Sequence, residues 1–225
     1  MEQHTLRVIA HIHSDFPTKF GVPRQSGLVD SLRSSVVFEP EYRNPDAVRG
    51  LEDFSHIWLI WQFSRAVRED WSPTVRPPRL GGNKRLGVFA TRSPFRPNAL
   101  GLSAVRLEAI EQGPVLRVAG ADLTDGTPIY DIKPYIPYAD AHPEAAGGFV
   151  DQVARRRLSV GCPPELLARV PDGKREALLG VLAEDPRPSY QEDPERVYGM
   201  AFAGMEVRFT VQGEILTVRE IFACG

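Results

Sequence analysis

Cysteine is scarce in this sequence: Cys162 and Cys224 are the only two, and neither lies in a paired motif. A disulfide framework or a thiolate zinc site is therefore not indicated, and we expect a reducing compartment. Long apolar runs are lacking as well, because the longest, Ile57–Trp61, is far too short to span a bilayer. The first residues do not combine a basic stretch with an apolar core, so we expect a cytoplasmic protein without a membrane anchor.

Several chemical signatures are also missing. No G-x-G-x-x-G follows an apolar strand and no G-x-x-x-x-G-K-[ST] occurs, so neither a Rossmann dinucleotide site nor a P-loop is supported. The absence of G-x-S-x-G argues against a hydrolase triad built on a nucleophile elbow. No three histidines are spaced as metal ligands, so we expect no metal site; the five are His4, His11, His13, His56 and His142.

Charge is nearly balanced overall but unevenly placed along the chain. The net charge of −2 and the isoelectric point near 6.2 do not indicate a general nucleic-acid binder. From Arg65 to Arg96, however, eight basic residues stand against two acidic ones. We interpret this part of the chain, called the basic segment below, as a face for an anionic ligand.

Short apolar segments dominate the first 140 residues and predict β-strands. Most of them alternate with polar residues, whereas 54–63 is apolar almost throughout and predicts a central strand. The predicted strands are 6–12, 36–38, 54–63, 86–90, 102–110, 115–119 and 129–132. A short helix is expected where Asn44 can cap a turn that starts with Pro45. Almost no long helical period separates the strands, which favours a closed or nearly closed barrel over a parallel βαβ sheet.

The composition changes after about Tyr138, and a second part of the chain follows. Residues 163–184 have helical spacing that is interrupted near Pro171. Three alternating segments come next, at 197–202, 205–211 and 215–222, and Gln212-Gly213 predicts a hairpin turn between the last two. We therefore predict a mainly β protein, with a small β-barrel domain over residues 1–142 and a smaller α+β domain over residues 150–225.

Three polar loops, at residues 23–28, 92–98 and 122–135, carry the groups that could bind a ligand. The first contains Gly27, which permits close backbone approach, and the second contains guanidinium groups that stay charged at any working pH. In the third, the backbone of residues 125–128 could pair with an adenine edge or an amino-acid moiety. Taken alone, the second loop can be a solvated surface hairpin and the third a tight turn. Together they are more specific, because binding residues concentrate on loops held by a scaffold.

The segments 20–28, 47–58, 74–82, 87–101 and 122–135, in this order, resemble the TsaA-like family of tRNA N6-threonylcarbamoyladenosine methyltransferases (TrmO type). The resemblance covers nearly all of residues 5–140, and residues 185–190, Asp-Pro-Arg-Pro-Ser-Tyr, are similar to the signature of the family's bacterial C-terminal domain. It implies a β-barrel enzyme that uses S-adenosylmethionine. The implied reaction is methylation of N6 of threonylcarbamoyladenosine at position 37 of a threonine tRNA, by a homodimer that contacts the anticodon loop.

The resemblance also implies the position of the cofactor site. The expected cofactor-binding residues are Gln25, Ser26, Gly27, Leu28, Ser64, Arg65, Arg92, Leu102, Asp125, Gly126, Thr127 and Pro128. Family members often have a histidine after the position of Phe63, where this chain has Ser64-Arg65.

Methyl transfer from a sulfonium is an in-line displacement, so the site must above all align the reacting atoms. The target nitrogen is a weak nucleophile that keeps one proton, and Asp131 and Tyr135 are the candidate catalytic residues to accept it. An arginine such as Arg92 or Arg96 suits the threonyl carboxylate of the modified base. The expected substrate-binding residues are Arg24, Arg96, Asn98 and Lys133, with Phe95 and Tyr135 as candidates for stacking on unpaired bases.

Two other interpretations of the sequence stay open. The barrel could bind S-adenosylmethionine as a non-catalytic module, or it could methylate a different nucleoside or a small molecule.

Overall fold

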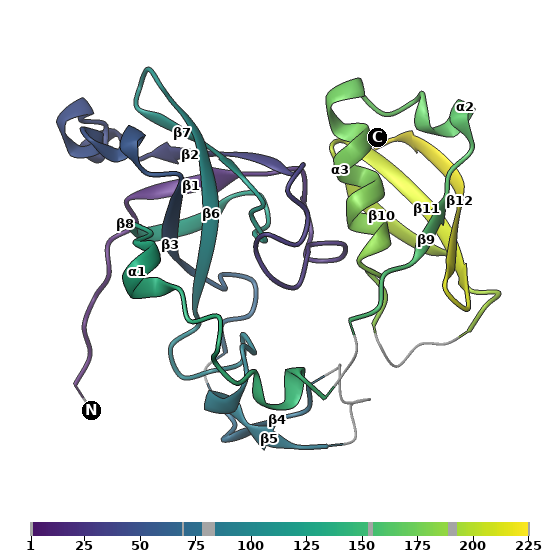
Figure 1. The fold of residues 1–225 in the computed structure, drawn as a ribbon, viewed down its shortest axis with the longest axis horizontal. Helices are drawn as coiled ribbons and strands as arrows, with labels where there is room; N and C mark the ends of the chain where they lie inside the picture. The colour runs from purple at the N-terminus through teal and green to yellow at the C-terminus, as the bar shows by residue number, and fades with distance from the viewer. Residues whose placement is uncertain (1, 69, 78–83, 153–154, 189–192, 225) are drawn as a thin grey trace.

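The computed structural model describes residues 2–68, 70–77, 84–152, 155–188 and 193–224 (Figure 1). Six antiparallel strands close into a barrel in the order β1-β2-β7-β6-β3-β8. They are β1 (Ala10–His13), β2 (Arg33–Phe38), β3 (His56–Gln62), β6 (Leu100–Glu111), β7 (Val115–Ala119) and β8 (Thr127–Pro134). The predicted mainly β architecture with an N-terminal barrel is confirmed.

The alternation of side chains along β3 shows how the barrel is filled. Ile57, Leu59 and Trp61 point inward and are buried, whereas the residues between them are only half-buried. Opposite Trp61 on β6 stands Gly101, where a Cβ would overlap the indole ring. The glycine therefore provides the space that lets the largest side chain of the barrel pack inside.

Short helices follow β2 and connect it to β3. They are the 3-10 turns η1 (Pro40–Tyr42), η2 (Pro45–Val48) and η3 (Leu51–Asp53). The predicted cap is confirmed, because the Asn44 side chain accepts a hydrogen bond of 3.0 Å from the N–H of Asp46. After β8, the chain forms α1 (Pro137–Asp140) and η6 (Gly148–Val150).

Two predicted strands differ from those in the structure. β1 begins at Ala10 rather than at residue 6, because the backbone hydrogen bonds that join it to its neighbours reach back only to Ile9, and Leu6 is exposed. The predicted strand 86–90 is also wrong beyond Gly87: β5 (Leu86–Gly87) pairs with β4 (Thr74–Val75) outside the barrel, and η5 (Val88–Ala90) follows. Only Val88 of this apolar run is fully buried.

The C-terminal part is a four-stranded sheet with helices against it (Figure 1). Its order is β10-β11-β12-β9, formed by β10 (Tyr198–Phe202), β11 (Met205–Gln212), β12 (Ile215–Ala223) and β9 (Ser159–Gly161). The predicted hairpin at Gln212-Gly213 is confirmed, whereas β9, three residues long and parallel to β12, was not predicted. The predicted break at Pro171 separates α2 (Pro164–Leu167) from α3 (Asp172–Ala183), whose buried face begins at Ala177.

The segment between β1 and β2, residues 14–32, joins the two parts of the molecule. Phe16, Val29 and Leu32 belong to the same hydrophobic core as α3 and the C-terminal sheet, and the Phe16 ring lies 5.3 Å from that of Phe202. The Asp15 carboxylate forms a 2.7 Å ion pair with Lys174 of α3. The first polar loop, residues 23–28, is therefore held between the barrel and the C-terminal sheet.

Some residues singled out from the sequence lie outside the described residues: Glu69, residues 78–82 including Arg79, Ser189 and Tyr190. The described helices include none that is long and apolar enough to cross a membrane. The division of the chain into domains 1–142 and 150–225 stays a prediction.

Candidate functional site

The loop of residues 23–28 lies directly against the end of β7. The N–H of Gly27 donates to the carbonyl of Gly120 at 2.9 Å, and both residues have a positive φ. A Cβ on Gly120 would come within 3.3 Å of the Gly27 backbone. The close approach of the two backbone segments therefore depends on glycine at position 120.

Arg92 of the second loop reaches the first loop. Its Nη1 donates to the side-chain oxygen of Gln25, while the Gln25 amide nitrogen donates to the carbonyl of Arg24. Gln25 and Ser26 are half-buried, and Arg92 is exposed. Two of the predicted cofactor-binding residues, far apart in the sequence, thus share one hydrogen bond.

The third segment contributes Asp122, which the sequence places in the third polar loop but not among the expected cofactor-binding residues. Ser103, only 1% exposed, accepts from the indole N–H of Trp61 at 2.9 Å and donates to Asp122 Oδ1 at 2.6 Å. Burial raises the pKa of Asp122, against the opposing effects of the Ser103 hydroxyl, backbone N–H groups including that of Ser26, and the charge of Arg92. Asp122 therefore joins Gln25, Ser26 and Arg92 in one polar cluster, called the Arg92 cluster below.

The turn at residues 125–128 begins three residues after Asp122, but its backbone donors are used inside the fold. The N–H groups of Asp125 and Gly126 donate to the carbonyls of Phe16 and Ile12 at 2.8 and 2.9 Å. Thr127 is buried, and its hydroxyl donates to the carbonyl of Thr124. The prediction that the backbone of this turn can pair with a ligand is therefore wrong for the N–H groups of Asp125 and Gly126. The Asp125 carboxylate is partly exposed and accepts a hydrogen bond from the N–H of Ser14 at 3.1 Å.

The remaining predicted cofactor residues occupy different surroundings. Leu28 packs against the C-terminal core, and Pro128 is buried at the start of β8. Ser64 and Arg65 are exposed just beyond the end of β3, and Arg65 donates to the carbonyl of Pro17. Leu102 lies on the outer face of the barrel, 57% exposed and opposite Ile60.

Arg24 links the first loop to the C-terminal part of the chain. Its Nη2 donates to the carbonyl of Arg187 at 3.0 Å. Arg187 in turn forms a two-point pair with Asp185, at 2.8 and 2.9 Å. The described part of the Asp-Pro-Arg-Pro motif therefore supports the loop that carries Gln25.

Two predicted substrate-binding residues lie in the second loop. Arg96 is half-buried and its guanidinium donates to the carbonyl of Thr91 at 3.2 Å, which holds the loop in shape. Asn98 is exposed just before β6. Both therefore follow Arg92 along one loop that leads back into the barrel.

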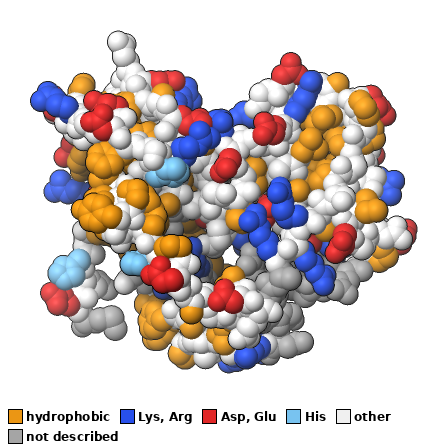
Figure 2. All heavy atoms as spheres, viewed as in Figure 1, with side chains coloured by type: hydrophobic (Ala, Val, Ile, Leu, Met, Phe, Trp, Pro, Cys, Tyr) orange, Lys and Arg blue, Asp and Glu red, His pale blue; other side chains and the backbone are white. Residues whose placement is uncertain are grey.

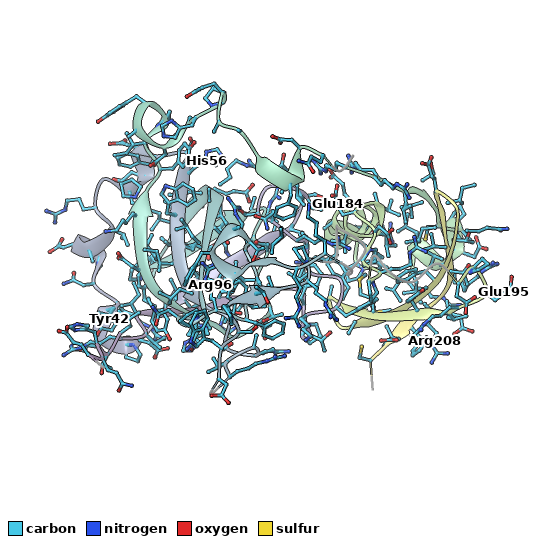
Figure 3. All side chains as sticks on the ribbon, turned by 90° about the horizontal axis from the view of Figure 1, so that it is seen from below. Tyr42, His56, Arg96, Glu184, Glu195 and Arg208 are labelled. Carbon is cyan, nitrogen blue, oxygen red and sulfur yellow. The ribbon has the colours of Figure 1, made fainter. Side chains whose placement is uncertain are left out.

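Asp131 and Lys133 lie on the outer side of β8, with Asp131 opposite Ile60, and Tyr135 follows the end of β8 beside His56. Asp131 forms a 3.2 Å ion pair with Lys133, and the Tyr135 ring packs against Trp58 at 5.4 Å and His56 at 6.2 Å. His56 is five residues from Trp61 along β3, roughly 17 Å at the rise of a strand. In the view of Figure 3, His56 and Arg96 also lie apart from each other. Within one subunit, Tyr135 therefore lies too far along the barrel to contact the Arg92 cluster.

A separate polar cavity of about 410 Å³ lies between the barrel and α3. Its cations are paired, since Arg33 lies 2.6 Å from Glu108 and Lys174 lies 2.7 Å from Asp15. Because these cations are already paired with carboxylates, the cavity does not have the charge of an anion site. The Lys174–Asp15 pair instead connects α3 to the segment that follows β1. Within the described ranges, no three His, Cys, Asp or Glu side chains are grouped to hold a metal ion.

Comparisons with known proteins match both parts of the chain. Residues 11–141 match the family model for the tRNA-methyltransferase O N-terminal domain, and residues 164–223 match that for the TrmO C-terminal domain. The chain is 39% identical over 222 residues to a tRNA (adenine(37)-N6)-methyltransferase of Escherichia coli, covering 94% of each chain. It is 41% identical over 218 residues to a Pseudomonas aeruginosa protein named as an S-adenosylmethionine-dependent methyltransferase, RcsF, covering 92% of each.

The fold is also similar to that of a solved structure. A crystal structure of TrmO from Pseudomonas aeruginosa aligns with a TM-score of 0.81 and 34% sequence identity. The alignment covers 100% of this chain and 99% of that one. The similarity therefore extends over the barrel, the connecting segments and the C-terminal sheet.

Proposed function

The chain belongs to the TrmO family of tRNA methyltransferases, and from this premise we propose that it methylates N6 of the adenosine at position 37 of a tRNA. S-adenosylmethionine is the methyl donor. We further propose that the acceptor is threonylcarbamoyladenosine in a threonine tRNA and that the enzyme acts in the cytoplasm as a homodimer. The observation that carries the proposal is the meeting of three polar segments at the Arg92 cluster.

The residues of the Arg92 cluster fit the chemical groups of the donor. S-adenosylmethionine supplies an electrophilic methyl group on a positively charged sulfur, together with a carboxylate, an ammonium group and an adenine. Arg92 and Gln25 offer charged and neutral donors to a carboxylate, and Asp122 offers an acceptor to a cation. Gly27 and Gly120 allow close backbone approach beside them. The remaining predicted cofactor residues extend this proposed site over Ser64, Arg65, Leu102 and the turn at 125–128.

The second polar loop is proposed to hold the modified base. Arg96 and Asn98 follow Arg92 along the loop, and a guanidinium group suits the threonyl carboxylate because two parallel N–H donors match its two oxygens. Arg24 and Lys133 are the other proposed substrate contacts. The basic segment, with Arg65 and Arg68 at its start, would face the phosphates of the anticodon loop.

The proton on N6 must leave as the methyl group arrives, and Asp131 and Tyr135 stay the proposed acceptors. Asp131 lies on the outer side of β8, and Tyr135 follows the end of β8, at the far end of β3 from the Arg92 cluster. For Tyr135, a role at the reacting nitrogen requires the second subunit of the proposed homodimer to supply it. Each active site would then combine the Arg92 cluster of one subunit with the partner's Tyr135.

Transfer of labelled methyl groups tests the proposal directly. The purified protein, incubated with methyl-labelled S-adenosylmethionine and tRNA from cells that lack it, is expected to label the tRNA, and nucleoside mass analysis is expected to place the methyl on threonylcarbamoyladenosine. Arg92→Ala is expected to abolish labelling, while Arg219→Ala, on the C-terminal sheet, is expected to leave it unchanged. Binding of the cofactor without any labelling would instead show a non-catalytic module, and label in another nucleoside would change the acceptor.

A further inference from the structure

Two large aromatic side chains stand exposed on the basic segment, apart from the barrel core. Trp71 is 52% exposed and Phe89 is 72% exposed, and their rings lie 6.1 Å apart with an angle of 34° between the planes. Figure 2 shows hydrophobic side chains on the lower lobe of the molecule, where Figure 1 places β4 and β5. Neighbouring exposed apolar side chains are a common feature of binding surfaces.

The local fold holds Phe89 outward. Its neighbour Val88 is 1% exposed and donates its N–H to the carbonyl of Pro73 at 2.9 Å, next to β4. The hydroxyl of Thr91 donates to the carbonyl of Val88 at 2.9 Å and closes the η5 turn. Because the Val88 side chain is buried, the side chain of the next residue in η5 points in a different direction, towards solvent. The conformation of the turn therefore keeps Phe89 exposed.

Among the described residues, the exposed charges of the basic segment are mostly positive, with Asp70 beside Trp71 as the exception. Arg68, Arg76, Lys84 and Arg85 are exposed, and none of them forms an ion pair with an acidic side chain of the described residues. Arg85 donates to the hydroxyl of Thr74 on the neighbouring strand at 3.3 Å. An aromatic surface with free cations beside it suits an unpaired nucleic acid, whose bases stack and whose phosphates are anionic.

The aromatics predicted from the sequence to stack on bases are already engaged. The guanidinium of Arg68 lies over the half-buried Phe95 ring, 3.8 Å from its centre. Tyr135 packs against Trp58 at 5.4 Å. Trp71 and Phe89 therefore offer more open ring surface than either of them.

We propose that Trp71 and Phe89 form a stacking platform for an unpaired base of the tRNA anticodon loop that flanks the target adenosine. This inference rests on the proposed function and names a part of its substrate site. Phe89 is three residues from Arg92, so their Cα atoms lie within about 11 Å, the reach of three extended residues. A base on the platform therefore lies close to the Arg92 cluster, and the neighbouring cations can contact the phosphates on either side of it.

Binding of a synthetic anticodon stem-loop RNA to the full-length protein tests the platform. Losing one stacked base is expected to raise Kd about 5- to 150-fold, so Trp71→Ala combined with Phe89→Ala should fall in or above that range. Trp71→Phe and Phe89→Tyr keep an aromatic face and are expected to stay near the wild-type Kd. Phe222→Ala is the matched control, because Phe222 is exposed and has Arg208 over its ring but lies on the C-terminal sheet.

Two further measurements separate stacking from a loss of structure or of charge. The RNA should quench tryptophan fluorescence in the wild type, and this quenching should be lost in Trp71→Phe, which still binds. In methyl transfer, the double alanine variant should raise KM for tRNA while kcat changes less than about twofold. The slope of log Kd against log salt should stay the same, because no phosphate contact is removed.

The outcomes distinguish this inference from the proposed function. If the wild type labels no tRNA, the proposed function fails. If it does label tRNA and the double alanine variant has an unchanged Kd and KM, only the platform is overturned. A double variant that sediments as a monomer where the wild type is a dimer, with unchanged affinity per chain for the RNA, would identify the pair as a subunit contact and also overturn the platform.

Discussion

The hydrogen-bond chain from Trp61 through Ser103 to Asp122 connects the barrel core to the Arg92 cluster, and Ser103→Ala removes its middle member. The substitution leaves the buried indole N–H without its acceptor at 2.9 Å and deprives Asp122 of a donor at 2.6 Å. Because Ser103 is 1% exposed, water has no direct access to replace the hydroxyl. We therefore expect a loss of stability as well as a change in the position of Asp122.

The size of this loss follows from the two groups that are left without a partner. A buried donor left unsatisfied costs about 1–3 kcal/mol, and a hydrogen bond to a carboxylate is worth about 1.5–3 kcal/mol. Allowing for relaxation, Ser103→Ala should lower the free energy of unfolding by about 2–5 kcal/mol. For a chain of this size, each kcal/mol corresponds to roughly 2–4 °C in Tm.

Urea unfolding followed by circular dichroism measures the effect, with Ser35→Ala as the control. Ser35 also bonds to a side chain, that of Arg117, but at the exposed outer face of β2, so its loss should cost less than about 0.5 kcal/mol. Combining Ser103→Ala with Trp61→Phe should cost less than the sum of the two single changes, because both remove the same contact. A loss below about 1 kcal/mol for Ser103→Ala, or strict additivity in the cycle, would refute the role given to this chain of hydrogen bonds.

The remaining predictions concern pH, packing and subunit composition. Burial raises the pKa of Asp122 in the folded state above its ordinary value of 3.8, so its contribution to stability is present below that value and is lost as pH rises through the folded-state pKa. The urea midpoint of Asp122→Asn should therefore fall less than that of the wild type over this range. Gly101→Ala should cost about 1–3 kcal/mol, because the added Cβ overlaps the Trp61 ring, and an unchanged unfolding midpoint would contradict this packing. If each active site combines two subunits, inactive Arg92→Ala and Tyr135→Ala chains mixed in equal amounts should recover about a quarter of the wild-type methyl transfer, since half of the dimers are mixed and each has one intact site. No recovery from a mixture shown to contain mixed dimers would place both residues in a site within one chain.

The barrel could be predicted from the sequence because each strand shows its own buried face. The bounds of β7 were predicted without error, because Leu116 and Val118 alternate with the exposed Arg117. β3 was predicted from a continuous apolar run instead, and in the barrel only alternate residues of it are fully buried. The lengths of the strands were predicted less well, because a strand ends where its partners end. Leu6 continues the alternation, but the backbone hydrogen bonds to the neighbouring strands reach back only to Ile9.

The candidate site was predicted in its composition but not in its geometry. Arg92 and Gln25 stood out because guanidinium and amide groups on loops indicate binding, and the structure joins them by a hydrogen bond. Asp122 belongs to the third polar loop but was not among the expected site residues, because its importance comes from burial and from Ser103, nineteen residues away on a neighbouring strand. The exposure of Phe89 was hidden for the opposite reason: an aromatic residue in an apolar run usually points inward, and the anchoring of Val88 turns its neighbour out.

The C-terminal part of the chain has a physical role in the site that its sequence alone does not indicate. The loop at residues 23–28 lies between two anchors in the C-terminal core, Phe16 before it and Val29 directly after it. α3 meets the second anchor so closely that a Cβ on Gly180 would come within 2.7 Å of the Val29 side chain. Because both ends of the loop are fixed to this core while Gly27 is bonded to the end of β7, the position of Gln25 beside Arg92 is set jointly by the barrel and the C-terminal sheet. A change in the packing of α3 would therefore reach the Arg92 cluster through the backbone of a single short loop.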